Sequence, residues 1–257
     1  MSQAVAQVVA GAAFALGAAL LAWRYELGLA RPLVTAAVRA AVQLAAVGAV
    51  VALVFRVPAL AVAFVAVMVV TAALTAGGRL RGLPGARRAA ALAIAVPALS
   101  ATAILLAVGA FDVTPRAAIP TAGILIGGAM AATTLTGRRL LEALARGGDE
   151  LEARLALGDA ARTALAPFTR QAITTGLVPA IDQTRSVGLV TLPGTFVGLL
   201  LGGASPAAAA RIQLTVLLAL LAVELLSAIV VAELITRACI RPGERIVVPP
   251  AAVAASR

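Results

Sequence analysis

Leu220-Leu221-Ala222-Val223-Glu224-Leu225-Leu226 is the centre of the apolar segment 207–236, which decides the fold of this chain. A helix needs about 20 predominantly apolar residues to cross the hydrocarbon core of a bilayer. Six further segments of suitable length precede it, at 4–22, 35–55, 58–76, 89–110, 117–136 and 177–203. The sequence therefore predicts an all-α, polytopic integral membrane protein with about seven transmembrane helices.

The composition supports a membrane protein. Of 257 residues, 62% are hydrophobic and 12% are charged, and the mean hydropathy is +1.04. Soluble domains are about 45–50% apolar and about 25% charged, so the apolar surplus is expected to face lipid. The chain has no Lys, no His and a single Cys, Cys239. Those absences exclude a Ser-His-Asp triad, a P-loop lysine and an internal disulfide, and we expect no enzymatic activity in this chain.

The arginines define a topology. A net charge of +10 and a pI near 11.7 could indicate nucleic-acid binding. However, 17 of the 21 arginines fall on one side of a seven-span arrangement, as expected when cytoplasmic segments carry the positive charge. We therefore expect an outside amino terminus and a cytoplasmic carboxyl terminus. The chain is interpreted as one transmembrane domain, residues 1–257, in the cytoplasmic membrane, and we expect it to bind no nucleic acid.

The longest cytoplasmic segment, 138–174, is the main soluble feature, with six of the 21 arginines and five of the 11 acidic residues. Its stretch 138–146 has leucines at helical spacing, Gly147-Gly148 interrupts it, and 149–158 resumes the helical pattern. The sequence thus predicts a helical hairpin projecting from the membrane. An amphipathic pair resting on the lipid headgroups is the alternative.

Glycine and proline mark the sixth span. Pro193 and Gly194 stand inside an apolar run, where they are expected to break the helix, and such breaks occur in transport paths. Glycines also recur at steps of four, a pattern that allows close helix approach. The pattern consists of Gly123, Gly127, Gly194, Gly198 and Gly202. These glycines could pack against other helices of the same chain or form the interface of a homodimer.

Ionisable residues inside a membrane are functional candidates because burying them costs free energy. Asp182 and Arg185 are three residues apart, close enough to pair, and we expect them near the inner interface. Glu224 has no basic neighbour on its own helix, and Arg39 with Gln43 is its candidate partner. These five residues, with Pro193 and Gly194, are the candidate path or gating residues.

Metal ligands are not identified by the sequence. Without His, a site would use carboxylates such as Glu224 and Asp182 with carbonyl oxygens, which favours hard cations. Lipid or organic substrates stay open as alternatives.

Three stretches resemble the FetB (YbbM-like) family of ABC permeases: residues 181–194, 201–206 and 155–158. The likeness is strong over 117–236. It implies a seven-helix permease, working with a separate ATP-binding subunit that holds ATP and Mg, and it implies metal export, iron in particular. The loop resembles a coupling helix that docks on the ATPase, which assigns that role to Glu152, Ala153, Ala156, Leu157 and Gly158.

The sequence departs from the family at two places. The family has Gly-Asn-Ala-Met-Asn where this chain has residues 127–131, Gly-Gly-Ala-Met-Ala. It has Met-Met-Thr-Gly-Gln where this chain has residues 195–199, Thr-Phe-Val-Gly-Leu. Amide, thioether and hydroxyl groups that could line a path or bind a metal are absent from these positions.

Three hypotheses follow from the sequence. The first is the membrane subunit of an ABC transporter, as a homodimer with two ATPase subunits. The second is a secondary transporter driven by protons through Glu224 and Asp182. The third is a membrane scaffold without transport, in which the sixth span only packs.

Overall fold

The computed structural model describes residues 2–55, 57, 59–80, 82–243 and 245–248. Residue contacts divide the chain into two units, Met1–Pro58 and Ala59–Arg257, and each is described by itself. We call them unit 1 and unit 2. That the two form one membrane domain stays a prediction.

Unit 1 is a pair of packed helices, α1 (Gln3–Arg24) and α2 (Ala30–Val54). The Ser2 hydroxyl accepts a hydrogen bond from the Val5 amide and so caps α1. The turn between the helices uses positive φ at Gly28, 68°. The second predicted span, 35–55, therefore begins earlier than expected, at Ala30.

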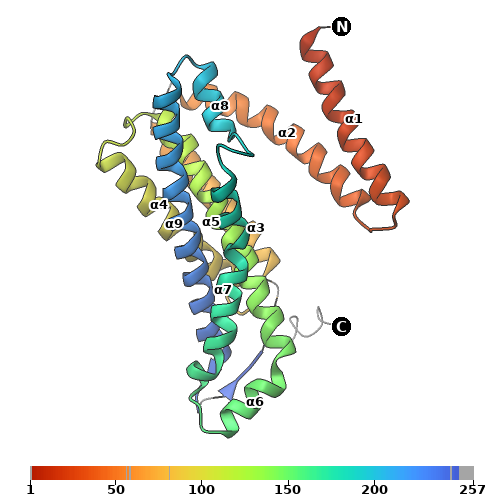
Figure 1. Cartoon of the computed structure of the whole chain (residues 1–257), viewed down its shortest axis with the longest axis vertical. Coiled ribbons are helices and arrows are strands. Elements are labelled where there is room, and N and C mark those ends of the chain that lie inside the picture. Colours follow the sequence, from red (N-terminus) through yellow and green to blue (C-terminus); the bar gives the residue numbers. More distant parts are fainter. Residues whose placement is uncertain (1, 56, 58, 81, 244, 249–257) are drawn as a thin grey trace. The chain divides into compact units, whose positions relative to one another are not determined.

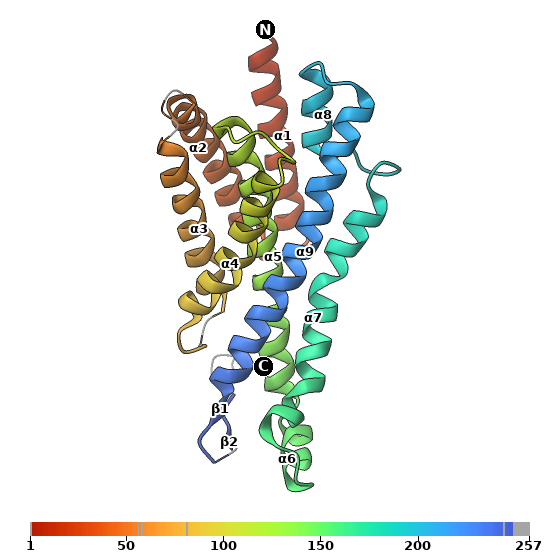
Figure 2. The same ribbon diagram turned by 90° about the vertical axis from the view of Figure 1, so that its left-hand side faces the viewer.

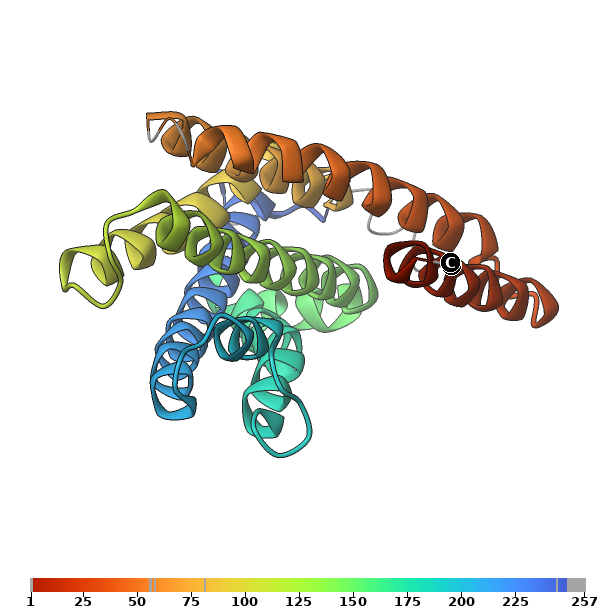
Figure 3. The same cartoon turned by 90° about the horizontal axis from the view of Figure 1, so that it is seen from above.

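Unit 2 is a helical bundle with a short β-hairpin (Figure 1). Its central helix is α5 (Pro115–Arg146), which packs against four other helices (Figure 3). These four are α3 (Ala59–Arg79), α4 (Ala86–Ala107), α7 (Ala161–Ser186) and α9 (Pro206–Cys239). The remaining elements are α6 (Gly148–Ala156), α8 (Gly194–Leu201) and the antiparallel strands β1 (Ile240–Arg241) and β2 (Arg245–Ile246).

Six helices are long and apolar enough to cross a membrane among the described residues: α1, α2, α3, α4, α5 and α9. The predicted sixth span, 177–203, is no single helix. It is divided between the end of α7 and α8, because the chain leaves the helical conformation before Pro193. The polytopic helical class is confirmed, while the count of seven spans and the orientation of the termini stay predictions.

The two longest helices extend beyond a bilayer core. With 32 and 34 residues, α5 and α9 measure about 48–51 Å at 1.5 Å per residue, against a core of about 30 Å. The predicted loop stretch 138–146 is therefore a continuation of α5. Figure 2 shows α6 at the end of unit 2 that α5 reaches and α8 at the other, and we call these the α6 end and the α8 end.

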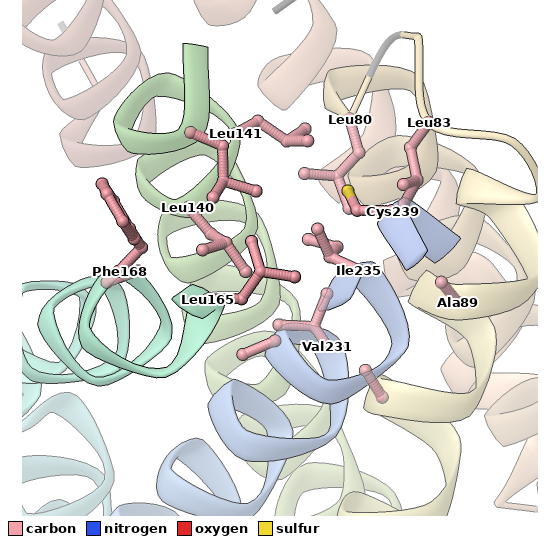
Figure 4. Packing of buried hydrophobic residues seen from close by; sticks show 14 of the residues in the cluster. Leu80, Leu83, Ala89, Leu140, Leu141, Leu165, Phe168, Val231, Ile235 and Cys239 are labelled. Carbon is pink, nitrogen blue, oxygen red and sulfur yellow. The ribbon is translucent and has the colours of Figure 1, made fainter. Parts of the chain in front are cut away.

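The core of unit 2 has two parts. In the first, small residues of α3, α4 and α5 pack closely with Val223 of α9. The second lies toward the α6 end, where leucines of α5 and α7 meet Val231 and Ile235 of α9 (Figure 4). Gly137 allows the close approach there, since a β-carbon on it would lie 2.7 Å from Leu80.

Candidate translocation path and coupling surface

Asp182 and Arg185 lie in the last turns of α7. Arg185 Nη1 is 3.9 Å from Asp182 Oδ1, so the two charges are neighbours, as the spacing predicted. The side chains are 65% and 78% exposed, respectively. Two ionised groups therefore stand on an open face of the helix.

The depth of this pair follows from a contact between α5 and α7. A β-carbon on Gly176 would overlap the hydroxyl group of Thr136, so these two residues lie at the same level. Because α7 returns antiparallel to α5 (Figure 2), Asp182 lies about 9 Å closer to the α8 end, near the level of Met130. The pair thus lies at the level of the predicted fifth span, 117–136, and its position relative to the inner interface stays a prediction.

The segment between α7 and α8, residues 187–193, is unwound. Gly188 has a φ of 86° and its amide donates to the Thr191 carbonyl over 2.9 Å. Leu189 is 92% exposed and Val190 82%. The predicted break at Pro193 is confirmed, and it is wider than expected because helix α7 already ends at Ser186.

A cavity of about 770 Å³ opens at the α8 end, between the start of α5, α8 and α9. Its polar lining comes from Asp112, Arg116, Thr121 and Thr195. Gly198 and Gly202 also line it, and a β-carbon on Gly198 would meet no atom within 4 Å.

The other predicted glycines differ in their surroundings. A β-carbon on Gly123 would lie 2.8 Å from Met68 of α3, so this glycine packs inside unit 2. Positions 127 and 194 face open space. A homodimer seam at the open positions stays a prediction.

Gln213 is a polar residue that the sequence analysis missed. It is 8% exposed, and its Oε1 has no hydrogen-bond partner within the described chain. It lines a cavity of about 360 Å³ together with Gly188 and Pro193 of the unwound segment. Its signal in the sequence was an amide inside the apolar segment 207–236.

Glu224 is buried in α9, with 9% of its surface exposed. Its Oε1 lies 2.9 Å from the position that a β-carbon on Gly128 would occupy, so α5 and α9 approach closely there. Within the described residues the carboxylate makes no hydrogen bond or ion pair. Its predicted partners Arg39 and Gln43 are exposed on α2 in unit 1, and that pairing stays a prediction.

The predicted coupling residues lie on α6 and the turn after it. Leu151 is 4% exposed and packs into the core of the α6 end. The predicted residues Glu152, Ala153 and Ala156 are exposed. Leu157 is 87% exposed, and Gly158 has a φ of 95°, which only glycine adopts without strain. The structure therefore presents these five residues together on one surface, the coupling surface.

The α6 end is braced by ion pairs that cross between helices. Glu233 of α9 accepts hydrogen bonds from Arg162 of α7 over 2.8 Å and from Arg237 over 2.7 Å. The sequence analysis missed Glu233, although its spacing from Arg237 was visible. Gly147 also packs directly against Phe168, so the start of α6 is held against α7.

Within the residues that the structure describes, no group of three or more His, Cys, Asp or Glu side chains could hold a metal ion. Asp182, Gln213, Glu224 and the unwound main chain are among the groups that carry oxygen atoms near the candidate path.

The sequence is similar to several known proteins. The family described as "Uncharacterised protein family (UPF0014)" matches residues 5–240. The UPF0014 membrane protein STAR2 of Oryza sativa subsp. japonica is 36% identical over 223 residues, which are 86% of this chain and 78% of the relative. The probable iron export permease protein FetB of Escherichia coli is 31% identical over 222 residues, 86% of each chain.

A further relative, Protein ALUMINUM SENSITIVE 3 of Arabidopsis thaliana, is 36% identical over 150 residues, which are 58% of this chain and 55% of the relative. No solved structure matches the chain.

Proposed function

This chain belongs to the FetB-like UPF0014 family of membrane permeases, and on that basis we propose that it is the membrane-spanning subunit of an ABC transporter that exports a metal ion. In this proposal ATP is hydrolysed by a separate subunit, which holds the ATP and its Mg. The chain itself binds no cofactor.

One observation carries the proposal of a path: charged and unwound elements lie together on an open face, at the level of the predicted fifth span, 117–136. Lipid cannot satisfy the exposed side chains of Asp182 and Arg185, because a charged or polar group in hydrocarbon costs several kcal/mol. Water or another protein surface must therefore cover this face. A water-lined face with a broken helix is what a translocation path requires.

The coupling surface supports a separate energy source. Glu152, Leu157 and their neighbours are exposed at the tip of α6, which packs through Leu151 into a core built by α5, α7 and α9. A force applied to α6 is therefore transmitted to the helix that bears Asp182. This arrangement suits docking by an ATPase subunit.

The cargo is proposed to be a metal ion, and iron in particular. The relative FetB is named a probable iron export permease, and the name of the Arabidopsis relative refers to aluminium. Carboxylate and carbonyl oxygens are ligands that hard cations prefer. Asp182, with the unwound carbonyls beside it, offers such oxygens on the open face.

We further propose a homodimer of the permease. The open surroundings of Gly127 and Gly194 leave room for a second copy to approach.

Co-purification tests the coupling surface. The chain is expressed with the ABC-type ATPase encoded nearest to its gene, and the ATPase retained with the tagged permease is measured. Glu152→Arg and Gly158→Arg are expected to abolish retention, whereas Asp112→Arg, at the α8 end, is expected to leave it intact. Full retention by both α6 variants would exclude the coupling assignment.

A second candidate function rests on Glu224. A buried carboxylate without a partner can carry a proton through a membrane, and with Asp182 it could serve a proton-driven secondary transporter. Transport by the chain alone in liposomes under a pH gradient, lost in Glu224→Gln, would favour this candidate.

A further inference from the structure

We infer that the α6 end of unit 2 carries a binding site for the phosphate headgroup of an anionic phospholipid, built from the loop between α3 and α4 and from the carboxyl-terminal hairpin. Five exposed arginines form it, which we call the headgroup patch: Arg79, Arg87, Arg88, Arg241 and Arg245.

The patch joins two distant parts of the sequence. Leu80 and Leu83, from the loop, pack in one core cluster with Cys239 at the end of α9, and Figure 4 shows the three side by side. Ile240 and Ile246 of the hairpin pack against the same cluster. The packing therefore holds the arginines of both segments around one core.

Among the described residues, the patch differs from five other arginines at this end in having no carboxylate partner. Arg138, Arg139 and Arg146 gather around Glu142 at 3.4–3.7 Å, and Glu233 pairs with Arg162 and Arg237. Among the described residues, none of the seven ion pairs includes an arginine of the patch. Glu244, between the hairpin arginines in sequence, lies outside the described residues. Within the described part of the chain, the patch thus gathers positive charge that no carboxylate pairs with.

A hollow of about 640 Å³ lies beside these charges. Glycines line much of it, at positions 77, 78, 82 and 85, and Arg87 with Arg88 stands at its rim. Gly77 is required for its shape, because a β-carbon there would lie 2.8 Å from Arg87 Cα. A compact anionic group fits such a hollow, since guanidinium groups bind phosphate oxygens in bidentate geometry.

The level of the patch identifies the ligand as lipid. Leu80, next to Arg79, contacts Gly137, which directly follows the predicted fifth span, 117–136. The loop is therefore at the level of the headgroups. The coupling surface lies further out, because α5 continues for nine residues, about 14 Å, from Gly137 to Arg146. Basic pockets between helices on the cytoplasmic side recognise anionic headgroups.

Native mass spectrometry of the full chain, released from nanodiscs of mixed phosphatidylcholine and phosphatidylglycerol, tests this inference. The wild-type chain is expected to retain phosphatidylglycerol in preference to phosphatidylcholine. The double variant Arg87→Gln, Arg88→Gln is expected to weaken that retention about thirtyfold, or about fivefold per arginine. Arg241→Gln with Arg245→Gln is expected to weaken it similarly.

The matched control is Arg138→Gln with Arg139→Gln. It removes the same formal charge, but from arginines that pair with Glu142 and do not line the hollow, so the affinity should fall by much less than in the patch variants. Equal loss of phosphatidylglycerol retention in the patch and control variants, or no loss in either, would overturn the inference. Saturation of the hollow by inorganic phosphate, in a chain that retains no phosphatidylglycerol, would also overturn it. So would patch variants that keep the lipid and lose the ATPase when the two proteins are co-purified.

Discussion

Gly176 of α7 and Thr136 of α5 are in such close approach that a β-carbon on the glycine would overlap the threonine hydroxyl. Thr136 is fully buried at this crossing. The contact fixes the level at which α7 returns along α5, and so places the exposed pair Asp182 and Arg185 at the level of the predicted fifth span, 117–136. A glycine in the middle of a helix thus sets the depth of the charged pair.

Gly176→Ala should therefore destabilise unit 2. We expect the free energy of unfolding to fall by about 1–3 kcal/mol, because the added methyl group has no room between α5 and α7. Gly127→Ala is the matched control, since position 127 faces open space, and its effect should lie within about 0.5 kcal/mol or be stabilising. Denaturation in detergent measures the free energy of unfolding of both variants. Equal stability of the two would contradict the close contact between Gly176 and Thr136.

Val190→Cys should react with a water-soluble thiol reagent. Position 190 is 82% exposed in the unwound segment, whereas Leu218 is 53% exposed on the apolar helix α9. Labelling at 190 should be at least about tenfold faster than in Leu218→Cys, because only the hydrated thiolate reacts. The native Cys239 is buried and gives little background. Slow labelling at both positions would show that lipid or protein, and not water, covers the break.

Glu233→Gln should loosen the junction of α7 and α9 with little loss of stability. The side chain is 30% exposed, and exposed ion pairs contribute about 1 kcal/mol or less. Hydrogen exchange at the first turn of α7 should nevertheless become faster, since Arg162 loses its partner. Glu150→Gln, which breaks one pair within α6, should leave exchange in α7 unchanged. Unchanged hydrogen exchange in Glu233→Gln would show that the ion pair between Glu233 and Arg162 does not hold α7 against α9.

Gly147→Ala should displace α6 and weaken ATPase retention. A β-carbon at 147 would overlap the Phe168 ring, whereas one at 148 would meet no atom within 4 Å. Gly148→Ala is therefore the control that should retain the ATPase fully. Co-purification measures both variants, and equal retention would mean that the Phe168 contact does not position the coupling surface.

The apolar segments were predictable because a membrane helix leaves a one-dimensional signal. Hydropathy found α1, α3, α4 and α9 within a few residues and the start of α5, but it ended α5 ten residues too early, and Pro193 marked the break. The end of α7 at Ser186 was not predictable, since no residue there forbids a helix.

The candidate site was only partly visible in sequence. Asp182 with Arg185 is a local pair, and its spacing alone predicted it. Gln213 beside Pro193, and Glu233 with Arg162, depend on how distant helices pack. Such three-dimensional neighbours have no signature in a single sequence. The depth of Asp182 likewise depended on one glycine contact between α5 and α7.

ATP-dependent transport tests the central claim most directly. Inside-out vesicles containing the chain and its ATPase partner should accumulate Fe²⁺ when ATP is supplied, and Glu152→Arg should abolish this accumulation. The chain alone should accumulate none, with or without a pH gradient. Fe²⁺ uptake by the chain alone under a pH gradient, unaffected by Glu152→Arg, would contradict the account.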